Sequence, residues 1–200
     1  MGQRPLLAFA AILALLSPSG AFEVQKGECQ RILSGEARVR IHYTSGLKVE
    51  VDPLSPDNIV TQVDIFPDGR RVSQKWLVGG GVLPLENPQG RFAYAEPTDL
   101  RFELGETRQF SYTLKLTDGR TSSGTMMLAI ERVEKAAFGE CQATFVTIAF
   151  ATAGVDGRRY SEIKRVFIRE IGFFIASTIE VRDGKSMPVT FEATRIELIR

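Results

Sequence analysis

The residue types needed for enzymatic catalysis are scarce in this sequence. Acyl transfer of the Ser-His-Asp kind requires a histidine base, and His42 is the one histidine in the chain. It falls on the polar face of a predicted strand, beside Arg38 and Arg40. No Gly-x-Ser-x-Gly elbow is present, and nothing distinguishes a catalytic pair among the 24 acidic residues. We therefore expect a surface histidine and a protein that is not an enzyme.

The sequence also lacks the residue patterns that metal, cofactor and nucleic-acid sites require. One histidine and two separated cysteines cannot form a structural zinc set, and no Asp-x-Asp-x-Asp-Gly calcium loop occurs. The run Gly79–Gly81 has neither the spacing nor the following Lys-Ser/Thr of a phosphate loop. Without Arg4, which lies in the N-terminal segment, 24 basic residues balance 24 acidic ones and are interspersed with them. We expect no metal, no cofactor and no nucleic-acid partner.

Cys29 and Cys141 are the two cysteines. In an exported protein they are expected to form one disulfide across 111 intervening residues. Loop-closure entropy would make this bridge worth roughly 4–5 kcal/mol before strain is subtracted. The alternative is two separate buried thiols.

The N-terminal 21 residues have the pattern of a secretory signal peptide. Arg4 precedes the apolar run Leu6–Leu16, and small residues at Ser19 and Ala21 follow. Cleavage is predicted after Ala21, which leaves one domain over residues 22–200. A membrane anchor is the alternative, but eleven apolar residues are fewer than the ~20 of a spanning helix. Nothing later is apolar enough to span a membrane as a helix, so a periplasmic or secreted protein is expected.

The rest of the chain reads as successive β-hairpins. In Phe110–Val133, apolar and polar residues alternate on both sides of Asp118-Gly119, a strong turn signal. In the predicted strand Ile59–Phe66, Ile59, Val63 and Ile65 share one face. A parity shift in the last strand, Val189–Ile199, predicts a bulge near Ala193–Arg195. Similar hairpins are expected at Val39–Val51, Ile59–Val78, Ala143–Arg169 and Phe173–Ile199.

These hairpins predict an all-β domain: one antiparallel meander of about ten strands, curled into an open or closed barrel to hide its edges. No stretch has a convincing helical period. The segment Gly79–Arg101, with three glycines in a row and prolines at 84, 88 and 97, is expected to be a long loop and a possible lid, with a short strand possible at Arg91–Tyr94.

The predicted strands place several aromatic residues toward the interior, where a curled sheet of this size can hold a small ligand. A plainly packed core is the alternative reading of the same residues. The strand Ala143–Ala151 is almost free of charge, which fits burial on both faces or a face that lines a cavity. The candidate cavity residues are Tyr43, Trp76, Phe110, Tyr112, Phe150 and Phe173, together with Phe191.

Four segments of the C-terminal half carry a resemblance to known proteins. They are Leu104-Gly105-Glu106, which opens a strand, Glu131–Lys135, Phe138–Ala143, which leads into a strand, and Phe167–Gly172, which precedes the final hairpin. From about Leu104 onward the chain resembles a family of exported bacterial β-proteins of unknown function. The resemblance implies a curved antiparallel sheet or open barrel and no established catalytic residues. Cys141 stands where such proteins more often have an apolar or hydroxyl residue.

Two functions follow as hypotheses. The first is a non-enzymatic periplasmic protein that binds an apolar or lipid-like ligand within the curved sheet. The second is a structural or adaptor module of the cell envelope with a solid core, which contacts a protein partner through its outer face or an edge strand. An enzyme of unrecognised type is the third and weakest.

Overall fold

The computed structural model describes residues 22–77, 83–96, 101–154, 159–181 and 188–199. The predicted signal peptide 1–21, the glycine run 79–81 and the predicted turns at 156–157 and 183–184 lie outside these residues. The described chain forms one short helix and thirteen strands. In chain order they are β1 (Glu23–Val24), α1 (Cys29–Leu33), β2 (Val39–Tyr43), β3 (Lys48–Val51), β4 (Ile59–Ile65), β5 (Arg71–Leu77), β6 (Leu83–Asn87), β7 (Gly90–Tyr94), β8 (Thr107–Leu116), β9 (Thr121–Phe138), β10 (Cys141–Gly154), β11 (Arg159–Ile168), β12 (Phe173–Val181) and β13 (Val189–Leu198).

The strands form a closed antiparallel barrel. Each strand from β2 to β13 pairs with the next one in the chain, and β13 pairs back with β2. The short strand β1 lies parallel to β13, with Glu23 opposite Arg195. The predicted all-β barrel is therefore confirmed, with twelve barrel strands where about ten strands were expected. Among the described residues no helix is long and apolar enough to cross a membrane.

Within Gly79–Arg101, the short strand predicted at Arg91–Tyr94 is confirmed by β7, but the expectation of a loop or lid is wrong for the other strand of the segment, β6. Residues 83–94 form β6, a two-residue turn and β7, which are part of the barrel wall. The prolines concealed this hairpin in the sequence. Pro84 lies opposite Trp76, next to a register shift in the β5–β6 ladder, and proline is tolerated where the ladder is irregular.

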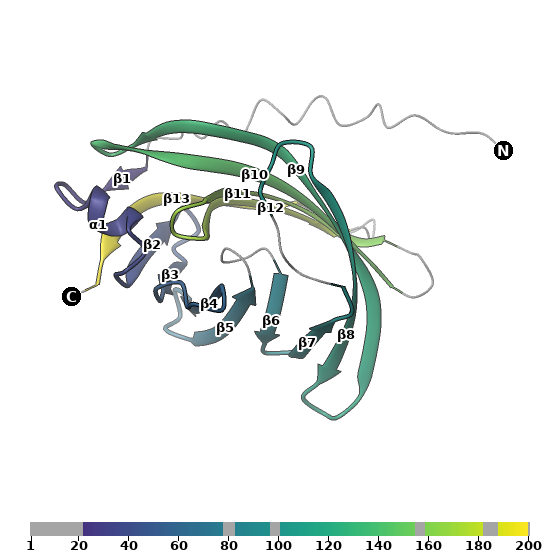
Figure 1. Ribbon diagram of the computed structural model, residues 1–200. Coiled ribbons are helices and arrows are strands. Elements are labelled where there is room, and N and C mark those ends of the chain that lie inside the picture. The colour runs from purple at the N-terminus through teal and green to yellow at the C-terminus, as the bar shows by residue number, and fades with distance from the viewer. Residues whose placement is uncertain (1–21, 78–82, 97–100, 155–158, 182–187, 200) are drawn as a thin grey trace.

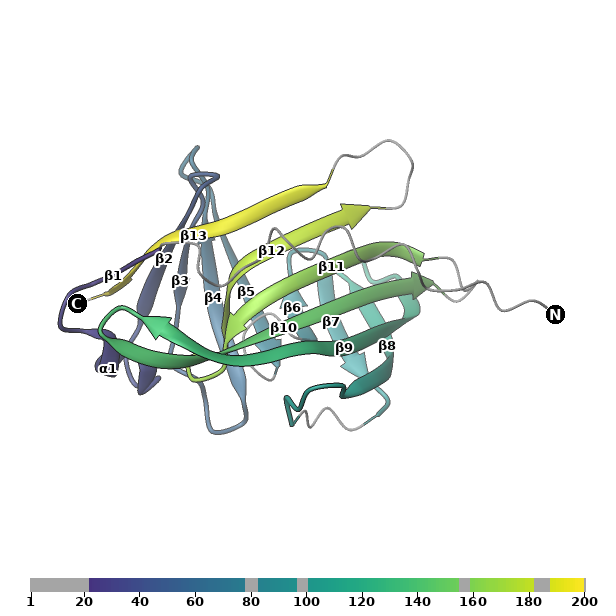
Figure 2. The same ribbon diagram turned by 90° about the horizontal axis from the view of Figure 1, so that it is seen from above.

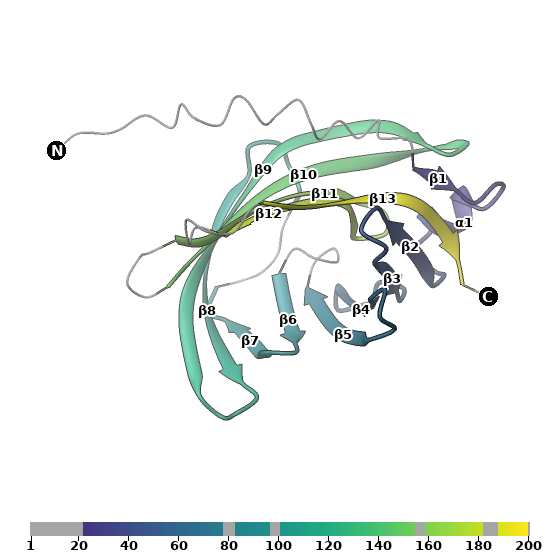
Figure 3. The same ribbon diagram turned by 180° about the vertical axis from the view of Figure 1, so that it is seen from behind.

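The barrel is flattened into two layers. The long strands β9–β13 form one layer and β2–β7 the other, with β8 at one side (Figure 1). The two layers face each other in the same way when seen from behind (Figure 3). The strands of the two layers cross at a steep angle when viewed from above (Figure 2). The core lies between the layers.

The hairpin expected at Phe110–Val133 is present as β8 and β9. Phe110 on β8 and Met126 and Leu128 on β9 alternate with more exposed neighbours, and each of the three is less than 10% exposed. At the turn, Gly119 has a φ of 85° and donates its N–H to Leu116 O at 3.0 Å. A positive φ is accessible to glycine at little cost, which is why Asp-Gly marks this turn. The bulge predicted near Ala193–Arg195 is also confirmed, by a register shift between those residues where β13 pairs with β2.

One end of the barrel is closed by the N-terminal segment. The predicted bridge between Cys29 and Cys141 is confirmed and ties α1 to the start of β10. Ile32 of α1 is fully buried, and Phe22 lies 5.8 Å from Phe138 between ring centroids. The sequence did not predict α1, because a five-residue helix is too short to show a helical period.

Candidate functional site: the barrel interior

Strand β4 turns its polar residues inward. Its ladders place Gln62 opposite Val51 of β3 and Asp64 opposite Val49, and both valines are core residues. Gln62 and Asp64 are accordingly 2% and 8% exposed. The apolar face expected from Ile59, Val63 and Ile65 points outward instead and is half-buried. The register with neighbouring strands, rather than local hydrophobicity, decides which face of β4 is interior.

The Asp64 carboxylate is held by two glutamines. Gln62 Nε2 donates to Asp64 Oδ1 at 2.7 Å, and Gln74 Nε2 of β5 donates to Oδ2 at 2.5 Å. Burial raises the pKa of Asp64 above its ordinary value, although both amides and the nearby Arg165 act in the opposite direction. The barrel therefore contains a buried carboxyl group that is shifted toward its neutral form.

Arg165 of β11 lies inside a cage of three aromatic rings. Its Cζ is 4.9 Å from the ring centroid of Phe174, 5.1 Å from that of Trp76 and 5.7 Å from that of Phe150. Aromatic faces attract a cation at such distances. Burial nevertheless lowers the pKa of Arg165 to about 10, against the attraction of Tyr43 and Asp64.

Among the residues that the structure describes, the buried polar atoms of this region without a hydrogen-bond partner include Trp76 Nε1, Ser177 Oγ and Gln62 Oε1. Ser177 of β12 is 1% exposed and stands directly opposite Arg165 in the β11–β12 ladder. More than nine in ten buried polar groups in proteins have a partner, so such a group near a buried cation needs an explanation. Tyr43, by contrast, is satisfied, because its hydroxyl donates to Phe174 O at 2.7 Å; burial raises the pKa of this hydroxyl well above its usual range.

At the end of the barrel where β13 begins, several inward-facing side chains are partly exposed to solvent. Val189 pairs with Ile179, and Ile179 pairs with Ile163, so the three share the inner face with Arg165 and Ser177. Val189 is 50% exposed. The row is apolar and reachable by water. Partly accessible inward residues at this end are Val72, Ile163, Arg165, Ile179, Val189 and Phe191.

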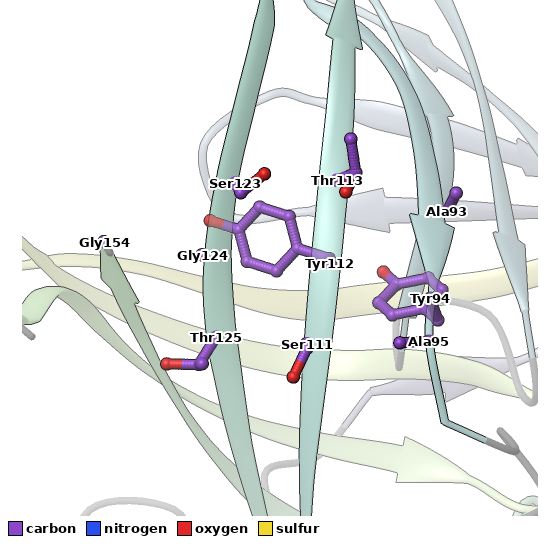
Figure 4. A pocket seen from close by; sticks show the side chains of 10 residues that line it. All are labelled: Ala93, Tyr94, Ala95, Ser111, Tyr112, Thr113, Ser123, Gly124, Thr125 and Gly154. Atoms are coloured by element: carbon purple, nitrogen blue, oxygen red, sulfur yellow. The ribbon is translucent and has the colours of Figure 1, made fainter.

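A pocket of about 620 Å³ borders strands β7, β8 and β9 and the end of β10 (Figure 4). Tyr94, Tyr112, Gly124 and Gly154 form one transverse row across these strands. A Cβ at position 124 would lie 2.7 Å from the Tyr112 hydroxyl oxygen and 2.5 Å from Ala153 O. Glycine is thus required for the ring of Tyr112 to reach across β9. The remaining lining residues are small: Ala93, Ala95, Ser111, Thr113, Ser123 and Thr125.

The six residues proposed for a cavity fall into three environments. Trp76 and Phe150 contact Arg165, and the ring of Tyr43 lies 5.7 Å from that of Phe174 in the same cage. Tyr112 borders the pocket. Two are packed in the core: Phe173 is fully buried and stacks on Phe174 at 4.6 Å, and Phe110 is 1% exposed beside Tyr94. Phe191, also expected inside, belongs to the accessible inward row.

Sequence reasoning missed the polar members of the interior: Gln62, Asp64, Gln74 and Arg165. The available signal was a polar or charged residue at an alternate position within an otherwise apolar strand face, such as Arg165 between Ile163 and Phe167. His42 lies on the outward face of β2, as expected, with Nε2 3.1 Å from Glu197 Oε1.

The fold and its interior define a twelve-stranded antiparallel β-barrel with a caged arginine. No family model matches the chain, and no curated protein matches it in sequence. Among solved structures it is similar to the hypothetical lipoprotein YmcC from Escherichia coli K12, with 9% sequence identity and a TM-score of 0.41. That match covers 80% of this chain and 86% of the other. A likeness this distant identifies neither a family nor a function.

Proposed function

We propose that this protein is a non-enzymatic protein of the bacterial periplasm that binds an apolar or amphipathic ligand inside its β-barrel. The observation that carries the proposal is the apolar row on the inner wall that stays accessible, from Ile163 across Ile179 to Val189. Inward positions of a barrel are either filled by packed side chains or line a ligand space. Solvent-accessible apolar side chains on the inner wall favour a space that holds a ligand.

The size of the pocket supports this role. Small-molecule sites commonly have volumes of about 300–1,000 Å³ and are lined by apolar and aromatic groups with a few polar ones. The pocket of about 620 Å³ beside Tyr94 and Tyr112 fits this range, and small residues surround the two rings. The Tyr94 hydroxyl donates a hydrogen bond to Pro84 O at 2.8 Å, and this bond holds the Tyr94 ring in the barrel wall.

The periplasmic location is supported by the Cys29–Cys141 disulfide, because such bridges persist in oxidising compartments. Export by the predicted signal peptide 1–21 would bring the chain there. The adaptor alternative has less support, because each described strand from β2 to β13 already has two neighbours. Strand addition by a partner needs a free edge.

The test is binding of a neutral apolar fluorophore, N-phenyl-1-naphthylamine, to the mature protein. Its fluorescence is expected to rise and saturate at one site. Val189→Lys, which places a charge on the accessible inner row, should weaken binding at least several-fold.

The matched control is Met127→Lys. Met127 is 48% exposed, close to the 50% of Val189, but it faces outward on β9. This variant should bind the fluorophore as the wild type does. No saturable binding to the wild type, or equal loss in both variants, would overturn the proposal.

A further inference from the structure

The strand register brings basic side chains together on the outer face of the barrel. Directly opposed pairs cross five strands: Arg195 of β13 with His42 of β2, His42 with Lys48 of β3, Lys48 with Ile65 of β4, and Ile65 with Arg71 of β5. Directly opposed residues project from the same face of a sheet, and His42 faces outward. These residues therefore form one outward-facing transverse row, which we call the basic row.

The carboxylate beside the basic row lies deeper than the cations that bind it. Glu50 of β3 pairs with Arg38, Arg40 and Arg71 at N–O distances of 3.3, 2.6 and 3.1 Å. The Glu50 side chain is 6% exposed, whereas those of the three arginines are 33–54% exposed. The positive groups of this cluster therefore lie nearer to the solvent than its negative group.

Glu197 of β13 is placed in the same way. It lies within 3.7 Å of Arg40, His42 and Arg195, and its side chain is only 20% exposed. The charges around the basic row almost balance in number, but the two central carboxylates are less exposed than the groups that bind them, so the surface itself is positive. The basic residues there are Arg38, Arg40, Lys48, Arg70, Arg71 and Arg195, and the acidic residues are Glu50, Asp52, Asp68, Glu192 and Glu197.

Two neighbouring turns carry apolar side chains beside the basic row. The turn between β2 and β3 carries Leu47, and the turn between β4 and β5 carries Phe66 and Pro67. The turns are in contact, because a Cβ at Gly46 would lie 3.2 Å from Pro67 Cγ. The guanidinium carbon of Arg70 lies 4.2 Å from the ring centroid of Phe66. Exposed apolar groups next to cations are the combination that binds the head-group layer of an anionic membrane.

These turns lie at the accessible end of the barrel. Thr44, in the first turn, donates its N–H to Glu192 O near the start of β13, at 2.9 Å. Val72, which follows Arg71 in β5, is one of the partly accessible inward residues at this end. The basic row and the accessible inner row therefore share one end of the molecule.

We propose that the basic row and the turns Thr44–Leu47 and Phe66–Arg70 bind the surface of an anionic phospholipid bilayer, with the accessible end of the barrel toward the lipid. A bilayer suits this surface better than an acidic protein, because the cations can bind lipid phosphates while the apolar turn residues enter the head-group layer. The inference concerns the outside of the barrel and does not depend on ligand binding inside it.

The experiment is co-sedimentation of the mature protein with two kinds of lipid vesicle. One is made of phosphatidylcholine alone, and the other contains about 30% phosphatidylglycerol, which supplies the negative charge. Binding to the anionic vesicles is expected to be at least about tenfold tighter, because several cations contact the charged surface at once. This preference should shrink when the salt concentration rises from about 50 mM to about 500 mM, since salt screens exposed charges.

Variants locate the surface. Lys48→Glu combined with Arg70→Glu reverses two charges and leaves the three arginines around Glu50 in place. This double variant should weaken binding to anionic vesicles about tenfold or more. Leu47→Ser removes an apolar side chain from the turn and should weaken binding about threefold.

The matched control is a second double variant, Lys115→Glu with Arg120→Glu. Arg120 follows Asp118-Gly119 as Arg70 follows Asp68-Gly69, but it lies in the hairpin of β8 and β9. The control changes the net charge of the protein by the same amount at a different place. It should bind anionic vesicles as the wild type does.

The outcomes distinguish a membrane from a protein partner. Equal binding to the two kinds of vesicle, binding to neither, or equal weakening in both double variants would refute the membrane surface. Binding of poly-glutamate that depends on Lys48 and Arg70, without binding to vesicles, would assign the surface to an acidic protein instead. Ligand binding in the barrel is measured with the fluorophore in the absence of vesicles, so the proposed function is tested separately. If circular dichroism shows that the first double variant does not fold, Arg70→Glu alone, in an exposed turn, decides the question.

Discussion

Replacing both Cys29 and Cys141 with serine is expected to lower the free energy of unfolding by several kcal/mol. The two residues are 112 positions apart in the chain. A cross-link closing a loop of that length removes unfolded-state entropy worth about 5 kcal/mol at 25 °C. The native contacts of α1 do not depend on the bridge alone, since Ile32 is fully buried in the core. We therefore expect the native fold to persist with a loss of about 3–5 kcal/mol, the upper part of the range for native disulfides.

Urea unfolding followed by the fluorescence of Trp76, the one tryptophan of the chain, measures this loss. With a slope of about 2 kcal/mol per molar urea, the midpoint should fall by roughly 2 M. Two controls test the cause. The wild type under reducing conditions and the single variant Cys29→Ser should both unfold where the double variant does, because each lacks the bridge.

A midpoint that falls by less than about 0.5 M with an unchanged slope would contradict the expected loss of unfolding free energy. That result would mean that the bridge does not restrict the unfolded chain as its position in the sequence requires. A normal midpoint in the reduced wild type with a low one in the serine variants would instead assign the loss to the substitutions themselves.

Three further predictions concern the pocket, the barrel seam and the caged arginine. Gly124→Val should lower the unfolding free energy by about 1–3 kcal/mol, since any Cβ there meets the Tyr112 ring; an unchanged melting temperature would contradict this close approach. The hydrogen bond with His42 holds the pKa of Glu197 below its ordinary 4.5. The stability from this carboxylate is thus complete above about 4.5 and is lost as the pH falls through its lowered native pKa, and Glu197→Gln should flatten that acid-side decline in urea-unfolding titrations. Arg165→Met should lower the unfolding free energy by about 3–5 kcal/mol, because it removes the cation that attracts the buried Asp64 and that three aromatic rings surround; an unchanged free energy of unfolding in chemical denaturation would contradict this.

Local patterns in the sequence were sufficient for most strands. The alternation on both sides of Asp118-Gly119 predicted β8 and β9, and the parity change near Ala193–Arg195 predicted the bulge in β13. Such features depend on neighbouring residues, because side chains alternate along any strand and a turn of this type favours glycine. The pairing of Cys29 with Cys141 followed from their number and the expected compartment.

The short elements were not predictable in the same way. Strand β6 contains Pro84 and has five residues, so its pattern resembled a loop, whereas β7 matches the short strand predicted at Arg91–Tyr94. Helix α1 spans little more than one turn. Both are held by contacts made elsewhere: Pro84 lies opposite Trp76, and α1 is tied to β10 by the disulfide.

The sequence by itself determined the fold class, the hairpin order and the bridge, because each depends on local periodicity or on a residue count. The tertiary structure alone decided which residues meet inside the barrel. Arg165 is caged by side chains from β5, β10 and β12, and Asp64 faces inward through its register with β3, against the apolar pattern of its own strand. These placements follow from backbone hydrogen bonds between strands and from the closure of β13 on β2. A register shift of one residue would reverse every face, so no pattern within a single strand could specify the site.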